Sequence, residues 1–517
     1  MQVFIPAAGL GLRTRAPNLD LPKPLLSVGM KPLIGRVMML YPKETNFVIA
    51  LGYKAEWVKQ VVEAVAKENN QKVKIFYTDS WKNAGQGLSH TVYEAKKYLE
   101  AEFIFHAVDS LIPSKICNQL LTSIRNSIVL GKPVSEEYYR YPEGSGWAKD
   151  KISPTGNSLV YTGVSAIHKT HEFWKFLEDM KEIAPESGET LGLNPENCEV
   201  IQIENNEWLD CGNTSGLDKT RQIFPTEEII LERKNEAIWH IGKQMYKFHT
   251  DENFILQRIE RSISLQPFVP LAKFVSNNIY SYDRVSGISL SKSNEEAFRD
   301  FLNFCLNFWF KIPERTSYPQ INFDKFYRIK TLERIHSFLQ KYPYYQIQKI
   351  NGEKVELIQD LLVKIPWKYL TDIHWARSHG DLHPDNVVYN EKSKTFSLLD
   401  WRQDFDGSTS HFGDLYYELG KINHGLIVDH EIVSKNGFYI DWRGDEAKCD
   451  IESGHEKETW KKIFQSFCVE NSFNINKMEI MTSLIFLNIA ILHHENYDKF
   501  LFTLGHKSLS DALRKLH

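Results

Sequence analysis

Several residues with acid–base or metal-binding side chains lie close together in the segment SHGDLHPDN, residues 378–386. His379 and His383 are four residues apart, a spacing that places two zinc ligands on one face of a helix. Gly380 and Pro384 both disfavour a helix here. The metalloprotease pattern also needs a glutamate directly after the first histidine, where this chain has glycine. A zinc site is therefore disfavoured, which leaves a catalytic loop or a charged turn.

The same segment suits phosphoryl transfer better. Asp381 can direct a carboxylate at an attacking hydroxyl group, and Asn386, five residues later, can direct an amide oxygen at Mg²⁺. The apolar stretches 387–389 and 396–399 predict two paired strands that bring Asp400 to the same metal ion. The order Asp, Asn, Asp is that of protein-kinase-like enzymes, with HGD in place of HRD and DWR in place of DFG. A charged hairpin without chemistry is the alternative.

A second candidate site is the segment IPAAGLGLR, in which a glycine-bearing loop follows the first predicted strand. Gly9 and Gly11 permit a tight turn that brings backbone N–H groups close to phosphate oxygens, and a following helix start favours anions. Arg13 would add a guanidinium fork. A Gly-x-Gly turn alone is weak evidence, because many strand-to-helix turns need glycine.

Further polar residues follow this loop along the chain. Lys23 lies between two prolines, which stiffen the loop that presents its ammonium group. The polar loop 84–90 precedes a predicted helix and suits the edge of a base or sugar. Asp109 ends an apolar stretch and Asp210 lies in EWLDCG; two such carboxylates can hold one Mg²⁺ together with substrate phosphates. Taken singly, each aspartate suits a turn or a helix cap equally well.

The elements that would position these N-terminal residues alternate between strands and helices. Apolar stretches predict strands at 2–7, 46–52, 72–78 and 102–108, and the stretches between them predict helices at 32–40, 54–68 and 88–99. Such alternation indicates an α/β fold with a mostly parallel, Rossmann-like sheet. Ligands bind beyond the carboxyl ends of parallel strands, where the glycine loop and Asp109 both fall.

The pattern changes at the charged, proline-bearing stretch 225–236. Short strands are predicted after it at 237–242, 243–249 and 278–285, and long helical stretches follow, such as 295–312, 326–342 and 478–504. We therefore expect two domains, residues 1–228 and 229–517. The second would be an α+β, two-lobed fold with a sheet-bearing lobe at about 229–290 and a helical lobe at about 291–517.

Composition narrows the class of protein. The chain has 517 residues and a formal net charge of −4, so no strong positive field attracts nucleic acid. Its six cysteines are widely spaced, which predicts reduced thiols and a cytoplasmic location. The longest apolar stretches are too short for membrane insertion. A homo-oligomer is compatible with the sequence, which does not reveal the oligomeric state.

The N-terminal motifs resemble those of the sugar-phosphate nucleotidylyltransferases. AAGLGLRTR, LPKPLL, GQGLSHTVYEA, FIFHAVDS, YTGV and EWLDCGNT occur in the expected order over residues 1–225. The resemblance implies catalytic roles for Lys23 and Arg13 at the phosphates, and Mg²⁺ at Asp109 and Asp210. It implies that five further residues contact the nucleotide and one the substrate: Ala8, Gly9, Gly11, Gln86 and Gly87, and Gly163, respectively. In one departure from the family pattern, Val108 precedes Asp109 where glycine is usual.

The C-terminal motifs resemble those of the aminoglycoside phosphotransferase and choline kinase group, which is related to protein kinases. HGDLHPDN, LLDWR and FGDLYYEL carry this resemblance, which covers about residues 235–517. It implies that Asp381 orients the substrate hydroxyl as the catalytic base, and that Asn386 and Asp400 hold Mg²⁺. Lys247 would contact the ATP phosphates and pair with Glu260, or with Glu252 as the runner-up.

The two resemblances together imply a bifunctional enzyme. ATP would phosphorylate a small sugar or amino-alcohol, and CTP, UTP or GTP would then convert the ester to a nucleotide conjugate for surface glycan biosynthesis, such as capsule or lipopolysaccharide. A sugar phosphorylated at its anomeric hydroxyl is the favoured acceptor. Two alternatives remain: a regulatory or binding protein with one inactive domain, and an antibiotic-modifying phosphotransferase.

Overall fold

The computed structural model describes residues 1–14, 21–82, 87–156, 158–204, 207–225, 235–311, 317–452 and 455–516. The described residues form two compact units. The first comprises residues up to 225 together with 235–251 and 275–281, and the second comprises 252–274 and 282–516. The predicted boundary between 228 and 229 lies outside the described residues.

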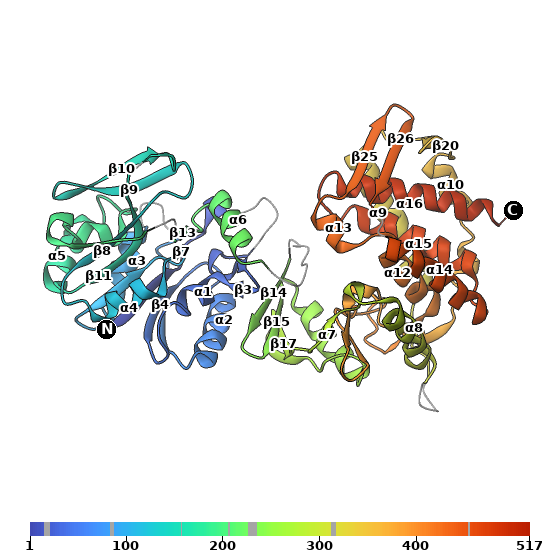
Figure 1. The fold of residues 1–517 in the computed structure, drawn as a ribbon, viewed down its shortest axis with the longest axis horizontal. Helices are drawn as coiled ribbons and strands as arrows, with labels where there is room; N and C mark the ends of the chain where they lie inside the picture. The colour runs from blue at the N-terminus through green and yellow to red at the C-terminus, as the bar shows by residue number, and fades with distance from the viewer. Residues whose placement is uncertain are drawn as a thin grey trace. The chain divides into compact units, whose positions relative to one another are not determined.

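A seven-stranded sheet forms the centre of the first unit (Figure 1). Its strands, in spatial order, are β12 (Glu199–Gln202), β8 (Ser127–Gly131), β11 (Val160–Ile167), β6 (Phe103–His106), β1 (Gln2–Ala7), β4 (Asn46–Leu51) and β5 (Lys72–Tyr77). All neighbouring pairs are parallel except the two that involve β11. The four strands predicted from apolar stretches and the mostly parallel sheet are therefore confirmed.

Helices cover both faces of this sheet because its strands are apolar on both sides. Val3 and Ile5 of β1 pack in one core with α1 (Leu33–Met38) and α2 (Ala55–Glu68). Phe4 points to the opposite face and packs in a second core. That core includes residues of α3 (Leu88–Ala95) and α5 (Thr170–Met180). The other helices of the unit are α4 (Ser114–Thr122) and α6 (Thr214–Ile223).

Several short elements complete the first unit, and Arg13, Lys23 and Asp210 lie in three of them. These elements are the 3₁₀ turns η1 (Leu12–Thr14), η2 (Lys23–Leu25), η3 (Gly188–Gly192) and η4 (Pro195–Asn197), and the two-stranded ladders β2 (Ser27–Val28) with β3 (Lys31–Pro32), β7 (Ser110–Leu111) with β13 (Leu209–Asp210), and β9 (Glu137–Glu143) with β10 (Gly146–Ile152).

A four-stranded sheet follows the N-terminal region in the sequence. Its order is β14 (Glu236–Ile241), β15 (Gln244–His249), β17 (Ile279–Asp283) and β16 (Lys273–Ser276). Trp239 is fully buried in the core of the first unit, and its indole N–H donates to the Leu25 carbonyl at 3.1 Å. Trp57 Nε1 likewise donates to Asn278 Oδ1 at 2.8 Å. Strands predicted for the second domain therefore pack largely with the first unit.

The second unit is mostly helical, and α12, α14, α15 and α16 lie side by side in it (Figure 1). Its longer helices are α7 (Glu252–Ser264), α8 (Glu295–Phe310), α9 (Lys330–Lys341), α12 (Leu415–Ile427), α14 (His455–Glu470), α15 (Ile475–Ala490) and α16 (Tyr497–Arg514). Shorter ones are η5 (Leu290–Lys292), the π-helical η6 (Lys325–Ile329), α10 (Ile358–Lys364), α11 (Trp367–Leu370), η7 (Pro384–Asn386) and α13 (His430–Ser434). The predicted stretch 478–504 is divided between α15 and α16.

Three small sheets complete the second unit. They are β18 (Ile288–Ser289), β22 (Val387–Asn390) and β23 (Thr395–Leu398); β21 (Trp375–Arg377) with β24 (Phe412–Asp414); and β20 (Glu353–Lys354), β19 (Lys349–Ile350), β26 (Glu446–Ile451) and β25 (Phe438–Arg443). The antiparallel pairing of β22 with β23 confirms the hairpin predicted after HGDLHPDN. No helix in the described part of the chain combines the length and the apolar character needed to cross a membrane.

Candidate functional sites

Lys23 and Asp109 form an ion pair at the carboxyl edge of the first sheet. Lys23 begins η2 directly after Pro22, whose backbone is extended, with φ −66° and ψ 144°. The Lys23 ammonium contacts Asp109 Oδ2 and lies 3.5 Å from the Gly212 carbonyl oxygen. Only 11% of the Lys23 side chain and 21% of the Asp109 side chain are exposed, so the pair is shielded but still reachable by a ligand.

The β7–β13 ladder brings Asp210 beside Asp109. Asp210 pairs with Ser110, and the Cys211 N–H donates to the Asp109 carbonyl at 2.8 Å. The Asp210 carboxylate accepts from the Gly212 N–H at 2.7 Å and from the Tyr139 hydroxyl at 3.0 Å. Burial, and then the charge of Asp109, raise the pKa of Asp210. Two crowded carboxylates beside a cation are a donor set that fits Mg²⁺.

The glycine loop lies against Lys23. Gly11 has a left-handed φ of +64°, and a Cβ atom built on it would come within 2.9 Å of Lys23 Cβ. Glycine is therefore needed there for both conformation and space. No atom of the described residues lies within 4 Å of a Cβ built on Gly9, which leaves open space next to that backbone. Ala8 is buried and its carbonyl accepts from the Tyr53 N–H at 2.9 Å. The Arg13 side chain lies outside the described part of the structure.

Gly163 and Gly87 occupy two further points near this edge. Gly163 lies in an irregularity of β11, with φ +80°, and its carbonyl accepts from the Ala107 N–H at 2.9 Å. It therefore faces the segment that leads to Asp109. Gly87 precedes α3, and a Cβ atom there would lie 2.6 Å from the Pro185 carbonyl oxygen. Gln86 lies outside the described residues.

Two buried residues near this site were missed in the sequence. His106 contacts the Tyr41 hydroxyl at 2.6 Å and the Ser110 carbonyl at 2.8 Å, and burial lowers its pKa to about 4. This neutral histidine supports the start of β7, directly after Asp109. Glu189 in η3 is buried, which raises its pKa to about 7, and its Oε2 accepts no hydrogen bond from the described residues. A glutamate in a glycine-bearing stretch, GETLG, was the only signal for it.

Asp381 forms the corresponding lysine–carboxylate pair in the second unit. Its Oδ1 lies 2.8 Å from the Lys421 ammonium on α12. The Asp381 side chain is 26% exposed, whereas Lys421 is buried. His379 is fully buried and its Nδ1 accepts from the Asp381 N–H at 3.3 Å. Burial lowers the pKa of His379 to about 3, so this ring is neutral and supports the loop.

Asn386 and Asp400 approach each other through the β22–β23 hairpin. The Asn386 side-chain amide donates to the Asp381 carbonyl at 2.9 Å, which orients its Oδ1 away from that bond. The Leu399 N–H donates to the Asn386 carbonyl at 2.7 Å, so Asp400 follows next to it in the chain. Asp400 has a left-handed φ of +58°, which is uncommon outside glycine and asparagine and frequent at functional sites. An amide oxygen and a carboxylate fit Mg²⁺.

Arg261 on α7 supports this loop from within the core. Its guanidinium donates to the carbonyl of Ser378, to those of His379 and Ser410 at 3.2 Å, and to that of Arg402 at 2.5 Å. The side chain is completely buried, and burial lowers its pKa to about 9. The sequence analysis did not identify Arg261, because a buried arginine in an amphipathic helix has no local signature.

Glu418 on α12 supports the same loop by accepting hydrogen bonds from its donor groups. Its carboxylate accepts from the Ser378 hydroxyl at 2.8 Å, the His379 N–H at 3.1 Å and the Gly380 N–H at 2.6 Å. Burial raises its pKa to about 7. Glu418 lies in the motif FGDLYYEL, so the signal was present, but the sequence did not indicate its role.

Lys247 and Glu260 belong to different units. Lys247 is half-buried on β15, and Glu260 is exposed on α7, next to the buried Arg261. Their predicted pairing, and the alternative with Glu252, remain predictions.

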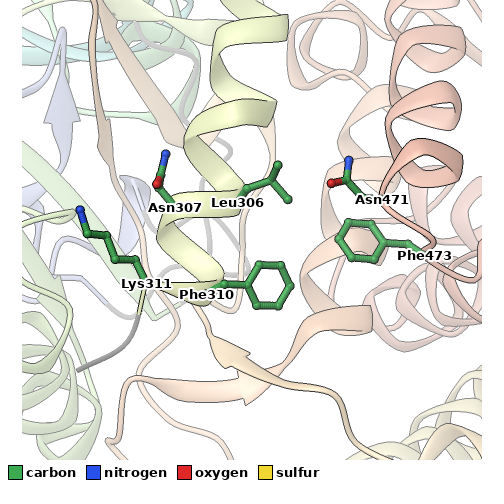
Figure 2. A pocket seen from close by; sticks show the side chains of 6 residues that line it. All are labelled: Leu306, Asn307, Phe310, Lys311, Asn471 and Phe473. Atoms are coloured by element: carbon green, nitrogen blue, oxygen red, sulfur yellow. The ribbon is translucent and has the colours of Figure 1, made fainter. Parts of the chain in front are cut away.

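A pocket elsewhere in the second unit contains none of these residues. It is lined by Leu306, Asn307, Phe310, Lys311, Asn471 and Phe473 and has a volume of about 600 Å³ (Figure 2). It offers one cation, two amides and apolar surface, and no carboxylate.

Comparison with solved structures finds matches that cover less than half of this chain. No family model matches the chain, and no curated protein matches it. Among solved structures, the inositol-1-phosphate CTP transferase of T. maritima has 15% identity and a TM-score of 0.34, covering 43% of this chain and 94% of that one. The CTP:phosphocholine cytidylyltransferase of Streptococcus pneumoniae has 17% identity and a TM-score of 0.33, covering 43% and 99%. HddC of Yersinia pseudotuberculosis has 21% identity and a TM-score of 0.32, with the same coverage.

Proposed function

We propose that the chain is a bifunctional enzyme that phosphorylates a small hydroxylated molecule with ATP and then transfers a nucleotidyl group to the product. The observation that carries this proposal is that each unit holds its own lysine–carboxylate centre beside oxygen ligands suited to Mg²⁺. The assignment of a nucleotidylyltransferase domain to 1–228 and of a two-lobed, kinase-like domain to 229–517 is part of the proposal.

In the first unit, a phosphate oxygen of the ester attacks the α-phosphorus of a nucleoside triphosphate, and the bond to the leaving pyrophosphate breaks. Lys23 contacts the phosphates at this point, and Arg13 and the Gly9–Gly11 backbone bind the triphosphate. Asp109 and Asp210 would hold Mg²⁺, which supplies charge neutralisation. Gly163, Gln86 and Gly87 contact the substrate and the base. The chemistry needs positioning and preorganised charge, with no covalent intermediate.

In the second unit, the acceptor hydroxyl attacks the γ-phosphorus of ATP, its proton passes to Asp381, and ADP leaves. Lys421 orients the Asp381 carboxylate, and the backbone contacts of Arg261 and Glu418 fix the loop. Asn386 and Asp400 would hold the Mg²⁺ that neutralises the phosphates. The prediction from the sequence that Lys247 and Glu260 bind ATP is part of the proposal.

The two reactions form a sequence because phosphorylation in the second unit produces the phosphate ester that nucleotidyl transfer in the first unit consumes. The product would be a nucleotide sugar or a CDP-alcohol, made in the cytoplasm for surface glycans such as capsule or lipopolysaccharide.

Mass spectrometry of reaction products tests this proposal. The protein is incubated with ATP, one of CTP, UTP or GTP, and a pool of sugars, sugar acids and amino-alcohols. A phosphate ester should form with ATP alone, and a nucleotide conjugate and pyrophosphate should appear when the second triphosphate is added. Absence of both products over the whole pool would contradict the proposal.

A further inference from the structure

Four basic side chains of the second unit lie near one another, and one of them, Lys421, pairs with Asp381 at 2.8 Å. Lys330 and Arg334 lie one turn apart on α9, Arg402 follows the Asp400 turn, and Lys421 projects from α12. Lys330 Nζ lies 3.5 Å from the centre of the Phe326 ring, and Arg402 Cζ lies 4.9 Å from the same ring. We call these four residues the basic cluster.

Three members of the basic cluster have no acidic partner. Within the described part of the chain, no carboxylate lies in ion-pair distance of Lys330, Arg334 or Arg402. Arg402 Nε donates to the Asp404 carbonyl at 2.8 Å, and Arg334 donates to the Asn488 carbonyl at 3.1 Å, so both bind neutral groups. By contrast, nearby Lys325 pairs with Asp406 at 2.9 Å. Arg334 and Arg402 therefore carry positive charge that no ion pair within the described residues neutralises.

The charges of the basic cluster act on one another. The pKa of Lys330 is lowered to about 6, first by burial and then by the positive charges of Arg402, Arg334 and Lys421. The charge of Asp404 acts in the opposite direction but does not offset these effects, and a half-buried ammonium outside any ion pair is costly unless a ligand supplies the opposite charge. An anion bound here would favour the charged form of Lys330 and relieve the repulsion among its neighbours.

Aromatic residues pack next to the basic cluster. Phe326 and Tyr417 form a ring pair with centroids 5.4 Å apart, and Tyr417 lies one turn before Lys421 on α12. The π-helical segment η6 ends directly before Lys330, and such segments occur frequently at functional sites. Both rings belong to the core of the second unit, so they hold the basic side chains beside them in place.

We propose that the acceptor phosphorylated by the second unit bears a carboxylate or phosphate group, which Lys330, Arg334 and Arg402 bind while its hydroxyl lies at Asp381. The inference rests on the proposed phosphoryl transfer and names its substrate class. In this reaction the hydroxyl oxygen bonds to the γ-phosphorus, its proton passes to Asp381, and ADP leaves. Amino-alcohols and aminoglycosides, which carry positive charge, are excluded as acceptors.

A library of acceptors sorted by charge tests the substrate class. ADP formation by the full chain is measured with sugar acids, sugar phosphates, neutral sugars, amino-alcohols and aminoglycosides. The best acceptor should be a sugar acid or a sugar phosphate, and the two groups distinguish carboxylate from phosphate. A neutral or cationic best acceptor would overturn the proposal.

Variants of the basic cluster test where the anionic group binds. Lys330→Met and Arg334→Met should each raise KM for the best acceptor about 10- to 100-fold, the loss expected for one charge-assisted hydrogen bond. KM for ATP should stay unchanged, as should both constants in the matched control Lys325→Met. A rise in KM for ATP alone would assign the basic cluster to the nucleotide, and unchanged constants would leave it no role; either result contradicts the proposal.

Direct binding separates this inference from the proposed function. Isothermal titration calorimetry measures D-glucuronate and D-glucose 6-phosphate against wild type and Lys330→Met. Binding of either anion that weakens in the variant supports the anion site even where no acceptor is phosphorylated, a result that would count against the kinase activity alone. Absence of binding by both anions, with no anionic acceptor turned over, would overturn the anion site.

Discussion

The two units centre their candidate sites on the same kind of ion pair, Lys23 with Asp109 and Lys421 with Asp381. In the first unit the backbone positions the pair: a proline-flanked turn carries Lys23, Gly11 permits close approach, and the β7–β13 ladder aligns the aspartates. In the second unit, buried charged side chains hold the loop through its backbone groups. The comparison predicts that the first site tolerates substitution of distant charges, whereas the second depends on them.

Asp381→Asn should produce the largest separation between the two sites. The amide cannot accept the hydroxyl proton, so phosphorylation of the acceptor should fall on the order of 10³-fold. Conversion of a supplied phosphate ester to its nucleotide conjugate should stay at the wild-type rate. Both rates are measured by product mass spectrometry. A parallel fall in both, in a variant that remains folded, would show that the two activities share one site.

Arg261→Met should test whether buried charge holds the second site. The change leaves four carbonyl groups of or near the loop without their donor, which should cost roughly 3 kcal/mol or more of stability. Unfolding in urea is monitored through the loss of each activity. The urea concentration at the unfolding midpoint should be lower than in wild type for phosphorylation only.

Arg299→Met is the matched control, because Arg299 forms an exposed pair with Glu295 at 2.8 Å. That pair should contribute less than about 1 kcal/mol. Equal destabilisation by the two variants would refute a special role for Arg261.

Lys23→Ala should give the reverse separation with a somewhat smaller effect. Loss of one preorganised charge at the phosphates should reduce nucleotidyl transfer by about 10²-fold or more. Phosphorylation by the second unit should remain unchanged. Lys82→Ala, which removes an exposed pair with Asp79, serves as the control. Near-normal turnover in Lys23→Ala would remove this lysine from the mechanism.

The sequence predicted four of the seven strands of the first sheet, β1, β4, β5 and β6, because short apolar stretches alternate there with helical patterns. It did not predict β8, β11 and β12, which complete the sheet beyond β6. It did not predict that Trp239 packs beneath Leu25, because the partner of an apolar strand depends on tertiary contacts that no local pattern records. The predicted boundary at 228 therefore assigns to the second domain several strands whose side chains share a core with the first unit.

The site residues also divide into those marked by a local sequence pattern, which were predicted, and those that depend on tertiary contacts, which were not. Glycine widens and proline restricts the conformations open to the backbone, so Gly11 and Lys23 stood out by their local context. The hairpin that carries Asn386 to Asp400 was also predictable from two apolar stretches. Arg261 and Glu418 were not, because a charged residue in a helical pattern is usually exposed and only the folded chain shows that these two are buried.

A buried glutamate in each unit provides the smallest and most specific test of the comparison. Burial raises the pKa of Glu189 and that of Glu418 to about 7. The folded chain therefore retains a proton that the unfolded chain has lost above about pH 4.5, so stability falls as pH rises and the fall ends above about pH 7. Relative to each glutamine variant, wild type should lose about 1 kcal/mol between about pH 5.5 and pH 6.5.

The two variants should agree in this pH slope and differ in absolute stability. Glu418→Gln keeps an oxygen that can accept from the Ser378 hydroxyl and the Gly380 N–H, which share Oε1, but places a donating NH2 group against the His379 N–H, so it should destabilise the second unit at every pH. Glu189→Gln removes a carboxylate whose Oε2 accepts no hydrogen bond from the described residues, so the first unit should be little affected below about pH 5 and more stable than wild type above about pH 7. Urea unfolding at several pH values, monitored through each activity, measures both the pH slope and the absolute stability of each variant. A similar loss in both variants at low pH would mean that Glu189 is held by its neighbours as tightly as Glu418, and that the two sites are built alike.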